Sequence, residues 1–253
     1  MAKIVDVLGY IEEIAPTENR CEWDNDGLQV CGDTDTDTKS VLLCLDVTDK
    51  AIDNAIKEGA KLIISHHPLI FQPVKSISTD VPESRLAIRL LDSGISLIAA
   101  HTRLDKAADG VNETLANTLG IKNIEHFGEE NIGIIGDIDS KTCKELALFA
   151  KEKLNVSSVS YVLGEKNVGR LAVVCGSGKD FLLDAKSSGA DALLTGDVSY
   201  TAFVIAQRYG IALIDAGHFY TEFPILSILE NKLRKRFPEL KISVYKEAIK
   251  EEI

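Results

Sequence analysis

Short apolar runs rich in β-branched residues alternate along the chain with longer amphipathic stretches. Short apolar runs are typical of buried strands, whereas apolar residues spaced three and four apart indicate a helix. Strands are predicted at residues 41–45, 61–65, 96–100, 171–175, 192–195 and 211–215. Because helical stretches separate these runs, the pattern predicts an α/β fold whose sheets are mainly parallel.

Two helices between these strands have recognisable ends. Residues 49–58 have apolar positions at the three-and-four spacing of one helix face, and Gly59 follows as a stop; these positions are Ala51, Ile52, Ala55 and Ile56. Residues 140–154 have a similar pattern, for which Ser140 is the expected N-cap.

The two halves of the chain contain similar segments in the same order. Residues 59–65, Gly-Ala-Lys-Leu-Ile-Ile-Ser, resemble residues 189–195, Gly-Ala-Asp-Ala-Leu-Leu-Thr, and residues 94–101 resemble residues 210–218. Chance similarity between strands of an α/β protein is the alternative explanation. The shared order favours an internal duplication, which predicts two related, intertwined α/β units.

Composition narrows the class of protein. With 253 residues the chain suits one large domain or two modest ones, of which we favour two. Its 45% hydrophobic and 26% charged residues are ordinary for a globular protein. A net charge of −11 disfavours a broad nucleic-acid surface, and the basic residues from Lys232 to Lys241 are expected on the solvated face of a helix. Since no apolar stretch approaches the roughly 20 residues of a membrane span, and the N-terminus lacks a signal-peptide pattern, we expect a cytoplasmic protein without a membrane partner.

The cysteines do not suggest a site. Five are scattered along the chain without a Cys-x-x-Cys pair, which favours neither a disulfide framework nor a thiolate zinc site. Cys44 and Cys175 lie on the predicted strands that precede the two repeat copies.

Histidines gather where the repeated strands end. The four strand ends read Ser65-His66-His67-Pro68, His101-Thr102-Arg103-Leu104-Asp105, Gly196-Asp197 and Gly217-His218-Phe219-Tyr220-Thr221-Glu222. Ligands of open α/β sheets bind beyond the carboxyl ends of the strands, so these residues lie where a site is expected. A histidine pair alone is more often a surface feature, and the spacing of His218 and Glu222 alone is weak. Together the segments supply imidazoles and carboxylates suited to zinc, iron(II) or manganese rather than calcium.

These strand ends, together with Trp23-Asp24-Asn25-Asp26-Gly27-Leu28-Gln29, resemble the Nif-three-like family of dinuclear metal-centre proteins, also labelled GTP cyclohydrolase I type 2. The resemblance extends from about Val5 to Lys246. It implies two divalent ions per subunit and a homohexamer, a trimer of dimers with a central cavity. One residue departs from the family pattern, because Asp26 occupies a position that is often apolar.

The resemblance also implies residue roles. His66 and His67 would each bind one of two metals, Asp105 would bind one ion and His218 the other, and Glu222 would bridge them. His101 would lie just outside these ligands, either shuttling a proton or orienting a neighbouring ligand. Because His218 and Glu222 must reach His66 and His67, we expect residues 1–125 plus 212–253 to form the ligand-bearing unit and residues 126–211 the other, with the site in the cleft between them.

Two classes of function remain open. The first is a metal-dependent hydrolase in which His101 and Glu222 are the catalytic candidates and metal-activated hydroxide attacks a nucleotide-like substrate, in the cyclohydrolase interpretation GTP. The second is a ring-shaped binding or regulatory module without turnover, whose partner is a protein or, less favoured by the charge, a nucleic acid. A mononuclear iron(II) oxygenase fits poorly with the surplus of ligands. The loop Gly176-Ser177-Gly178 is either a phosphate contact or a tight turn.

Overall fold

The computed structural model describes residues 1–249 and divides them into two compact units. Unit 1 contains residues 1–108 and 226–247, and unit 2 contains residues 109–225 together with 248 and 249. Within the described residues, none of the helices is long and apolar enough to cross a membrane.

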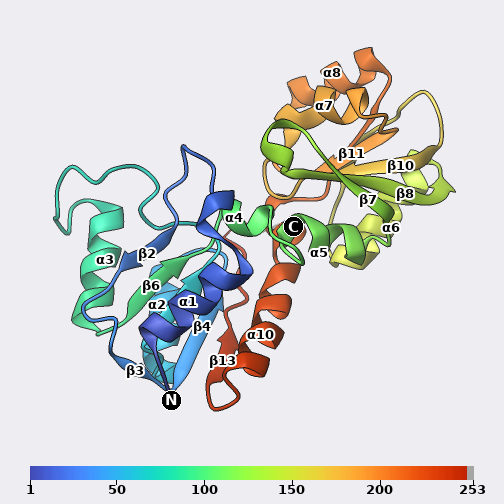
Figure 1. Cartoon of the computed structure of the whole chain (residues 1–253). Coiled ribbons are helices and arrows are strands. Elements are labelled where there is room, and N and C mark those ends of the chain that lie inside the picture. Colours follow the sequence, from blue (N-terminus) through green and yellow to red (C-terminus); the bar gives the residue numbers. More distant parts are fainter. Residues whose placement is uncertain (250–253) are drawn as a thin grey trace. The chain divides into compact units, whose positions relative to one another are not determined.

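Unit 1 is built on a largely parallel sheet with the strand order β13-β4-β5-β6-β2. Its strands are β1 (Ala2–Lys3), β2 (Gly27–Val30), β3 (Asp37–Thr38), β4 (Ser40–Cys44), β5 (Leu62–Ser65), β6 (Ser96–Ala99) and β13 (Lys241–Val244), and its helices are α1 (Ile4–Ile14), α2 (Asp49–Glu58), α3 (Pro82–Asp92) and α4 (Thr102–Asp105). β13 comes from the far end of the chain and pairs in parallel with β4 (Figure 1). Among the described strands of this five-stranded sheet, only β2, at the other margin, is antiparallel to its neighbour, and β1 and β3 form a separate antiparallel pair.

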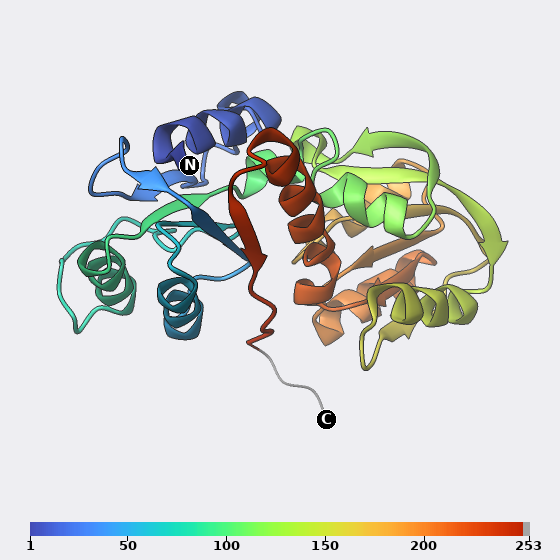
Figure 2. The same cartoon turned by 90° about the horizontal axis from the view of Figure 1, so that it is seen from below.

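Helices cover both faces of this sheet, with α1 on one face and α2 and α3 on the other (Figure 2). Strands that are covered on both faces have continuous apolar sequences. This is the case for β4, β5 and β6, which are buried along their whole length. The expected helix at 49–58 is confirmed. Thr48 caps its start by accepting from the Ala51 N–H, and Gly59 ends it in the left-handed region.

Unit 2 has a mixed sheet with the order β7-β8-β10-β11-β12-β9. Its strands are β7 (Lys122–Phe127), β8 (Gly133–Lys141), β9 (Ser160–Val162), β10 (Val168–Val173), β11 (Ala192–Thr195) and β12 (Ala212–Asp215), and its helices are α5 (Val111–Thr118), α6 (Cys143–Leu154), α7 (Leu182–Ser187), α8 (Tyr200–Tyr209) and α9 (His218–Glu222). Helix α10 (Pro224–Arg236) begins in unit 2, and its later residues belong to unit 1. β10, β11 and β12 are parallel, whereas β7, β8 and β9 add antiparallel margins that the apolar runs did not predict.

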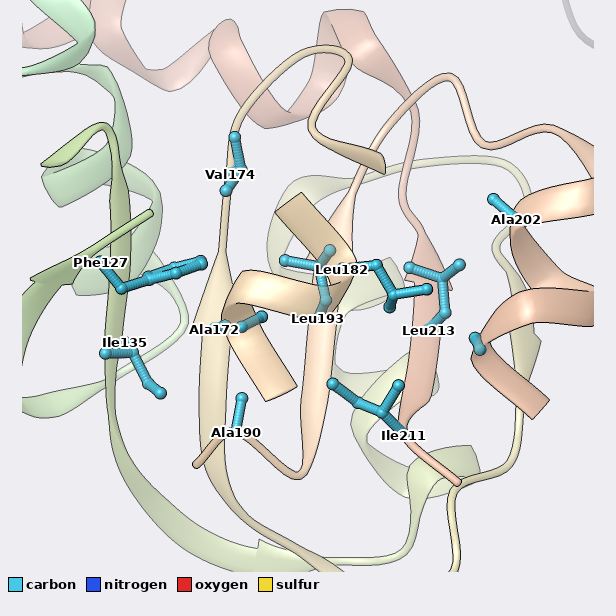
Figure 3. Packing of buried hydrophobic residues seen from close by; sticks show 12 residues of the cluster. Phe127, Ile135, Ala172, Val174, Leu182, Ala190, Leu193, Ala202, Ile211 and Leu213 are labelled. Atoms are coloured by element: carbon cyan, nitrogen blue, oxygen red, sulfur yellow. The ribbon is translucent and has the colours of Figure 1, made fainter. Parts of the chain in front are cut away.

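The core of unit 2 lies between its parallel strands and the helices α7 and α8. Ala172, Leu193 and Leu213, one from each central strand, face Leu182 of α7 and Ala202 of α8 (Figure 3). Alternate residues of the same strands, such as Val173 and Leu194, are also fully buried, and α5 and α6 cover that other face (Figure 1). This two-sided burial fixes the strands whose ends carry the candidate site.

One expected helix start was wrong. Helix α6 begins at Cys143 rather than Ser140, and Ser140 lies in β8. The reason is a capping box, in which the Thr142 hydroxyl accepts from the Glu145 N–H and the Glu145 carboxylate accepts from the Thr142 N–H.

The two units repeat one arrangement. In unit 1, β4-α2-β5-α3-β6 leads into the short helix α4, and in unit 2, β10-α7-β11-α8-β12 leads into α9. The pairing registers align as well, because Val41 lies opposite Leu62 and the equivalent Leu171 lies opposite Ala192. This register places Val174 at the position of Cys44, so the two cysteines noted above are offset by one residue.

The unit boundaries differ from the expected 125/126 and 211/212. β12 pairs with β11 through four consecutive positions, which keeps residues 212–225 in unit 2. Residues 109–125, including α5, also belong to unit 2. His218 and Glu222 therefore follow the sheet of unit 2 and not that of the unit that contains His66 and His67.

Candidate metal centre

The carboxyl edge of the unit 1 sheet gathers the predicted histidines. His66 and His67 follow β5, and His101 follows β6 immediately before α4, which ends at Asp105. Each of His66, His67 and His101 offers a ring nitrogen, and these three atoms lie within 4.8 Å of one another. The strand ends thus bring together side chains of His67 and His101, which are 34 residues apart in the chain (101 − 67).

His66 is held deep in this edge. Its Nδ1 lies 2.8 Å from the Ala100 carbonyl oxygen, and since a carbonyl only accepts hydrogen bonds, Nδ1 carries a proton. The remaining nitrogen, Nε2, lies 3.6 Å from Oδ1 of Asp105. The His66 side chain is fully buried, so its orientation is fixed by the protein rather than by solvent.

His67 is oriented by a carboxylate instead of a carbonyl. Its Nδ1 lies 2.9 Å from Oδ1 of Asp46, which follows β4 at the same edge of the sheet. The Asp46 carboxylate therefore holds the Nδ1 proton and leaves Nε2 as the nitrogen that can coordinate a metal. The sequence interpretation missed Asp46, although applying the strand-end rule to β4 would have found it.

His101 is oriented by Asp24, the residue that follows Trp23. Asp24 accepts hydrogen bonds from His101 Nδ1 at 2.9 Å, from the Thr102 N–H at 3.0 Å and from the Thr102 hydroxyl at 2.6 Å. Burial opposes ionisation of Asp24, but the bonds from His101 and Thr102 outweigh it and lower the pKa from 3.8 to about 2. Asp24 therefore lies behind His101 and fixes the orientation of its ring.

Asp26, the departure from the family pattern, pairs with a neighbour of these residues. Its Oδ2 lies 3.2 Å from Nε of Arg103 and accepts from the His101 N–H at 3.2 Å. Both side chains are about 1% exposed. Burial raises the pKa of Asp26 although the Arg103 guanidinium opposes that shift. Because Arg103 lies in α4 between His101 and Asp105, this buried ion pair anchors the helix that presents both.

Unit 2 presents a smaller ligand set. His218, the first residue of α9, directs Nδ1 to Oδ2 of Asp197 at 2.7 Å and Nε2 to Oε1 of Glu222 at 3.1 Å. The i,i+4 spacing on one helical turn brings His218 and Glu222 together, as the sequence predicted. The Glu222 side chain is 6% exposed, and Asp197 follows β11.

A glycine makes room for this pair. A Cβ on Gly176 would collide with Oε1 of Glu222 and lie 3.1 Å from Nε2 of His218, and its φ of +64° also favours glycine. The Gly176 N–H donates to the Thr221 hydroxyl at 3.0 Å, and the Gly178 N–H donates to the Thr195 hydroxyl at 2.7 Å. Since the backbone donors of both glycines are engaged within unit 2, the geometry favours the tight-turn interpretation of this loop over a phosphate contact.

His126 belongs to neither of these ligand sets. It lies on β7, where Nδ1 contacts the Asn131 carbonyl oxygen at 3.0 Å and Nε2 lies 3.9 Å from Glu113. Its side chain is 41% exposed, as expected for a surface histidine.

The donor chemistry of both sets fits divalent transition metals. In His66, His67, His101 and His218, Nδ1 faces a carbonyl or carboxylate oxygen, the arrangement that fixes Nε2 as a coordinating atom. Two ligands of one tetrahedral zinc ion lie about 3.4 Å apart when each metal–ligand bond is about 2.1 Å. The separations of His66 from Asp105 and of His218 from Glu222, 3.6 and 3.1 Å, bracket that value.

Fold and site together define a class of protein: a duplicated α/β fold with histidine and carboxylate sets at the carboxyl ends of its strands. The model of the family Duf34/NIF3 (NGG1p interacting factor 3) matches residues 2–252. The chain belongs to this family, which confirms the assignment made from the motifs.

Relatives and solved structures agree with that assignment. A Clostridium perfringens protein named "GTP cyclohydrolase 1 type 2 homolog" is 36% identical and covers 97% of each chain. A relative of the same name from Clostridium acetobutylicum is 35% identical over 91% of this chain and 89% of its own length. The crystal structure of the Staphylococcus aureus hypothetical protein SA1388 has a TM-score of 0.88 at 28% identity and covers 99% of each chain.

Proposed function

We propose that this protein is a metal-dependent hydrolase that holds two divalent ions with His66, His67, Asp105, His218 and Glu222 and acts on a nucleotide-like substrate. The observation that carries the proposal is the set of histidines whose Nδ1 atoms face carbonyl or carboxylate oxygens, which leaves Nε2 as the coordinating nitrogen. The names of the two clostridial relatives support GTP as the substrate to test first.

The ligand chemistry suits zinc, iron(II) or manganese. Bound there, divalent ions would supply Lewis acidity, which lowers the pKa of coordinated water toward neutrality and stabilises developing negative charge. Glu222 and Asp105 provide the carboxylate charge that such ions require. The proposal includes the homohexamer that the family resemblance implies, which sedimentation of the purified protein would measure.

His101 is the proposed proton carrier. The Asp24 carboxylate, with a pKa of about 2, remains ionised and holds the proton on His101 Nδ1. This leaves Nε2 of His101 to accept a proton from water or substrate and later return it. A ring nitrogen of His101 lies within 4.8 Å of ring nitrogens of His66 and His67, so the proposed proton carrier adjoins the proposed metal ligands.

The test combines metal content with turnover. Elemental analysis of wild type, His67→Ala and Glu222→Ala should give about two ions per chain in wild type and fewer in both variants. His126→Ala, which removes a histidine outside the proposed ligand set, should retain the wild-type content. Hydrolysis of a nucleotide panel that includes GTP should fall in parallel with metal loss.

Two results would contradict the proposal. A wild-type protein that remains metal-free after incubation with zinc, iron(II) and manganese would overturn the metal site. Two bound ions without hydrolysis of any nucleotide would favour the binding or regulatory module over the enzyme.

A further inference from the structure

The polar side chains of the segment Trp23 to Gln29 form hydrogen bonds and an ion pair within unit 1. Asp24 bonds to His101 and Thr102, and Asp26 pairs with Arg103. Asn25 and Gln29 both donate to the Ile70 carbonyl oxygen, and the Gln29 amide oxygen accepts from the Ile70 N–H at 3.0 Å. This network joins the segment to the loop after His67 and fixes the backbone on both sides.

Two aromatic rings project from these two fixed segments. Trp23 is 59% exposed and Phe71 is 40% exposed, whereas Phe127 and Phe237 in the cores are 4% and 6% exposed. The Trp23 and Phe71 ring centroids lie 6.1 Å apart at an interplanar angle of 67°. Both rings therefore expose apolar surface that a ligand could bury.

The same two rings adjoin the histidine cluster. Trp23 and Phe71 each have a ring centroid 6.3 Å from that of His101, which in turn lies 5.3 Å from His66 and 5.7 Å from His67. The rings therefore form an aromatic corner at the edge of the proposed metal site. All of these residues belong to unit 1.

We propose that Trp23 and Phe71 bind the planar heteroaromatic ring of the substrate, a purine-type base, and hold it beside His101. Because the rings are steeply inclined, one can stack on the face of a base while the other contacts its edge. A base has a π-face whatever its substituents, so the corner explains affinity for a class of molecules rather than for one base. This inference rests on the proposed function and adds the part of the substrate that unit 1 recognises.

Trp23 is the single tryptophan of the chain, so its fluorescence reports on this corner directly. Guanosine and GTP should quench it saturably, whereas ribose 5-phosphate, which lacks an aromatic ring, should not. Equilibrium dialysis should show that Trp23→Ala weakens GTP binding about 5- to 150-fold, the range expected for loss of one base–aromatic stack. Trp23→Phe should retain most of the affinity, and Phe71→Ala should weaken binding less than Trp23→Ala.

Tyr209→Ala is the matched control, because Tyr209 is a 49% exposed aromatic residue at the end of α8 in unit 2. It should bind GTP like wild type. Circular dichroism of each variant checks that the fold is retained, as expected for substitutions of exposed rings.

The outcomes separate this inference from the proposed function. Absence of quenching by both purine compounds, or GTP binding by Trp23→Ala at wild-type affinity, would overturn the aromatic corner, even if wild type hydrolyses GTP. Saturable quenching and weakened binding in Trp23→Ala, without turnover in wild type, would support the corner and overturn the hydrolase.

Discussion

The two units share a scaffold and differ in what they place at the strand ends. By register and repeat alignment, Asp46, His66 and His101 of unit 1 correspond to Gly176, Gly196 and Gly217 of unit 2. Unit 1 thus carries polar side chains where unit 2 carries glycine. The exception is His67, whose counterpart, Asp197, orients a histidine.

The glycines of unit 2 leave space for residues of helix α9. A Cβ on Gly196 would collide with the backbone N of His218, and Gly176 leaves space for the Glu222 carboxylate. In unit 1 the first helical residue after the third strand is Thr102, whereas in unit 2 it is His218. A duplicated strand edge can therefore provide functional side chains in one copy, and in the other copy provide glycines that leave space for a neighbouring helix.

The largest expected effect is on the metal content, when a side chain fills the space at Gly176. Gly176→Ala should displace Glu222 and His218 and lower the metal content per chain, measured by elemental analysis after dialysis. Gly189→Ala is the matched control, since Gly189 also has a positive φ, +87°, but nothing lies within 4 Å of its added Cβ. Gly189→Ala should lose about 1 kcal/mol of unfolding free energy from backbone strain. Gly176→Ala should lose more, because its Cβ also collides with Glu222, and only this variant should lose metal. Equal metal content in the two would contradict the assigned role of Gly176.

Disruption of the buried ion pair in unit 1 should have the second-largest effect. Arg103→Met leaves Asp26 buried without its cation and should lower the free energy of unfolding by about 3–5 kcal/mol. Urea unfolding followed by Trp23 fluorescence measures this within unit 1. The double variant Asp26→Val with Arg103→Met should recover most of the loss, because it removes both charges. A double variant as unstable as Arg103→Met would show that the pair is not the cause.

Acid should weaken unit 1 through Asp24. Its pKa in the folded protein, about 2, lies below the value of 3.8 for the unperturbed group, so the ionised carboxylate stabilises the fold above about pH 4. This contribution, roughly 2 kcal/mol, should disappear as the pH falls from 4 to 2. Urea unfolding at a series of pH values should show a smaller loss over that interval in Asp24→Asn. The exposed-carboxylate variant Asp139→Asn should keep the wild-type dependence, and an unchanged slope in Asp24→Asn would refute the assignment.

The carboxylates behind His67 and His218 should have the smallest effects, and they test whether the units contribute equally. Asp46→Asn and Asp197→Asn should each lower metal affinity about 10- to 100-fold, measured by competition with a chelator. The loss should be smaller for Asp197, whose side chain is 55% exposed against 34% for Asp46. Wild-type affinity in Asp46→Asn would mean that this carboxylate does not orient a ligand.

Elements that depend on local pattern could be predicted from the amino-acid sequence alone. Continuous apolar runs gave β4, β5, β6, β11 and β12 to within a residue or two, because strands buried on both faces require them. The repeat and the motifs identified the family, and the i,i+4 spacing placed Glu222 beside His218. Each strand, each motif and the His218–Glu222 pair depends on residues close together in the chain, and the repeat requires only a comparison of two such segments.

Tertiary structure decided what depends on distant residues. The antiparallel margins β7, β8 and β9 are weakly apolar and partly exposed, so pairing partners rather than composition fix them. The membership of residues 212–225 in unit 2 follows from the β12 ladder. Asp46 behind His67, Asp24 behind His101 and Arg103 against Asp26 join residues 21 to 77 positions apart. Such contacts form only when the sheet brings strand ends together, and no local pattern in the chain encodes that proximity.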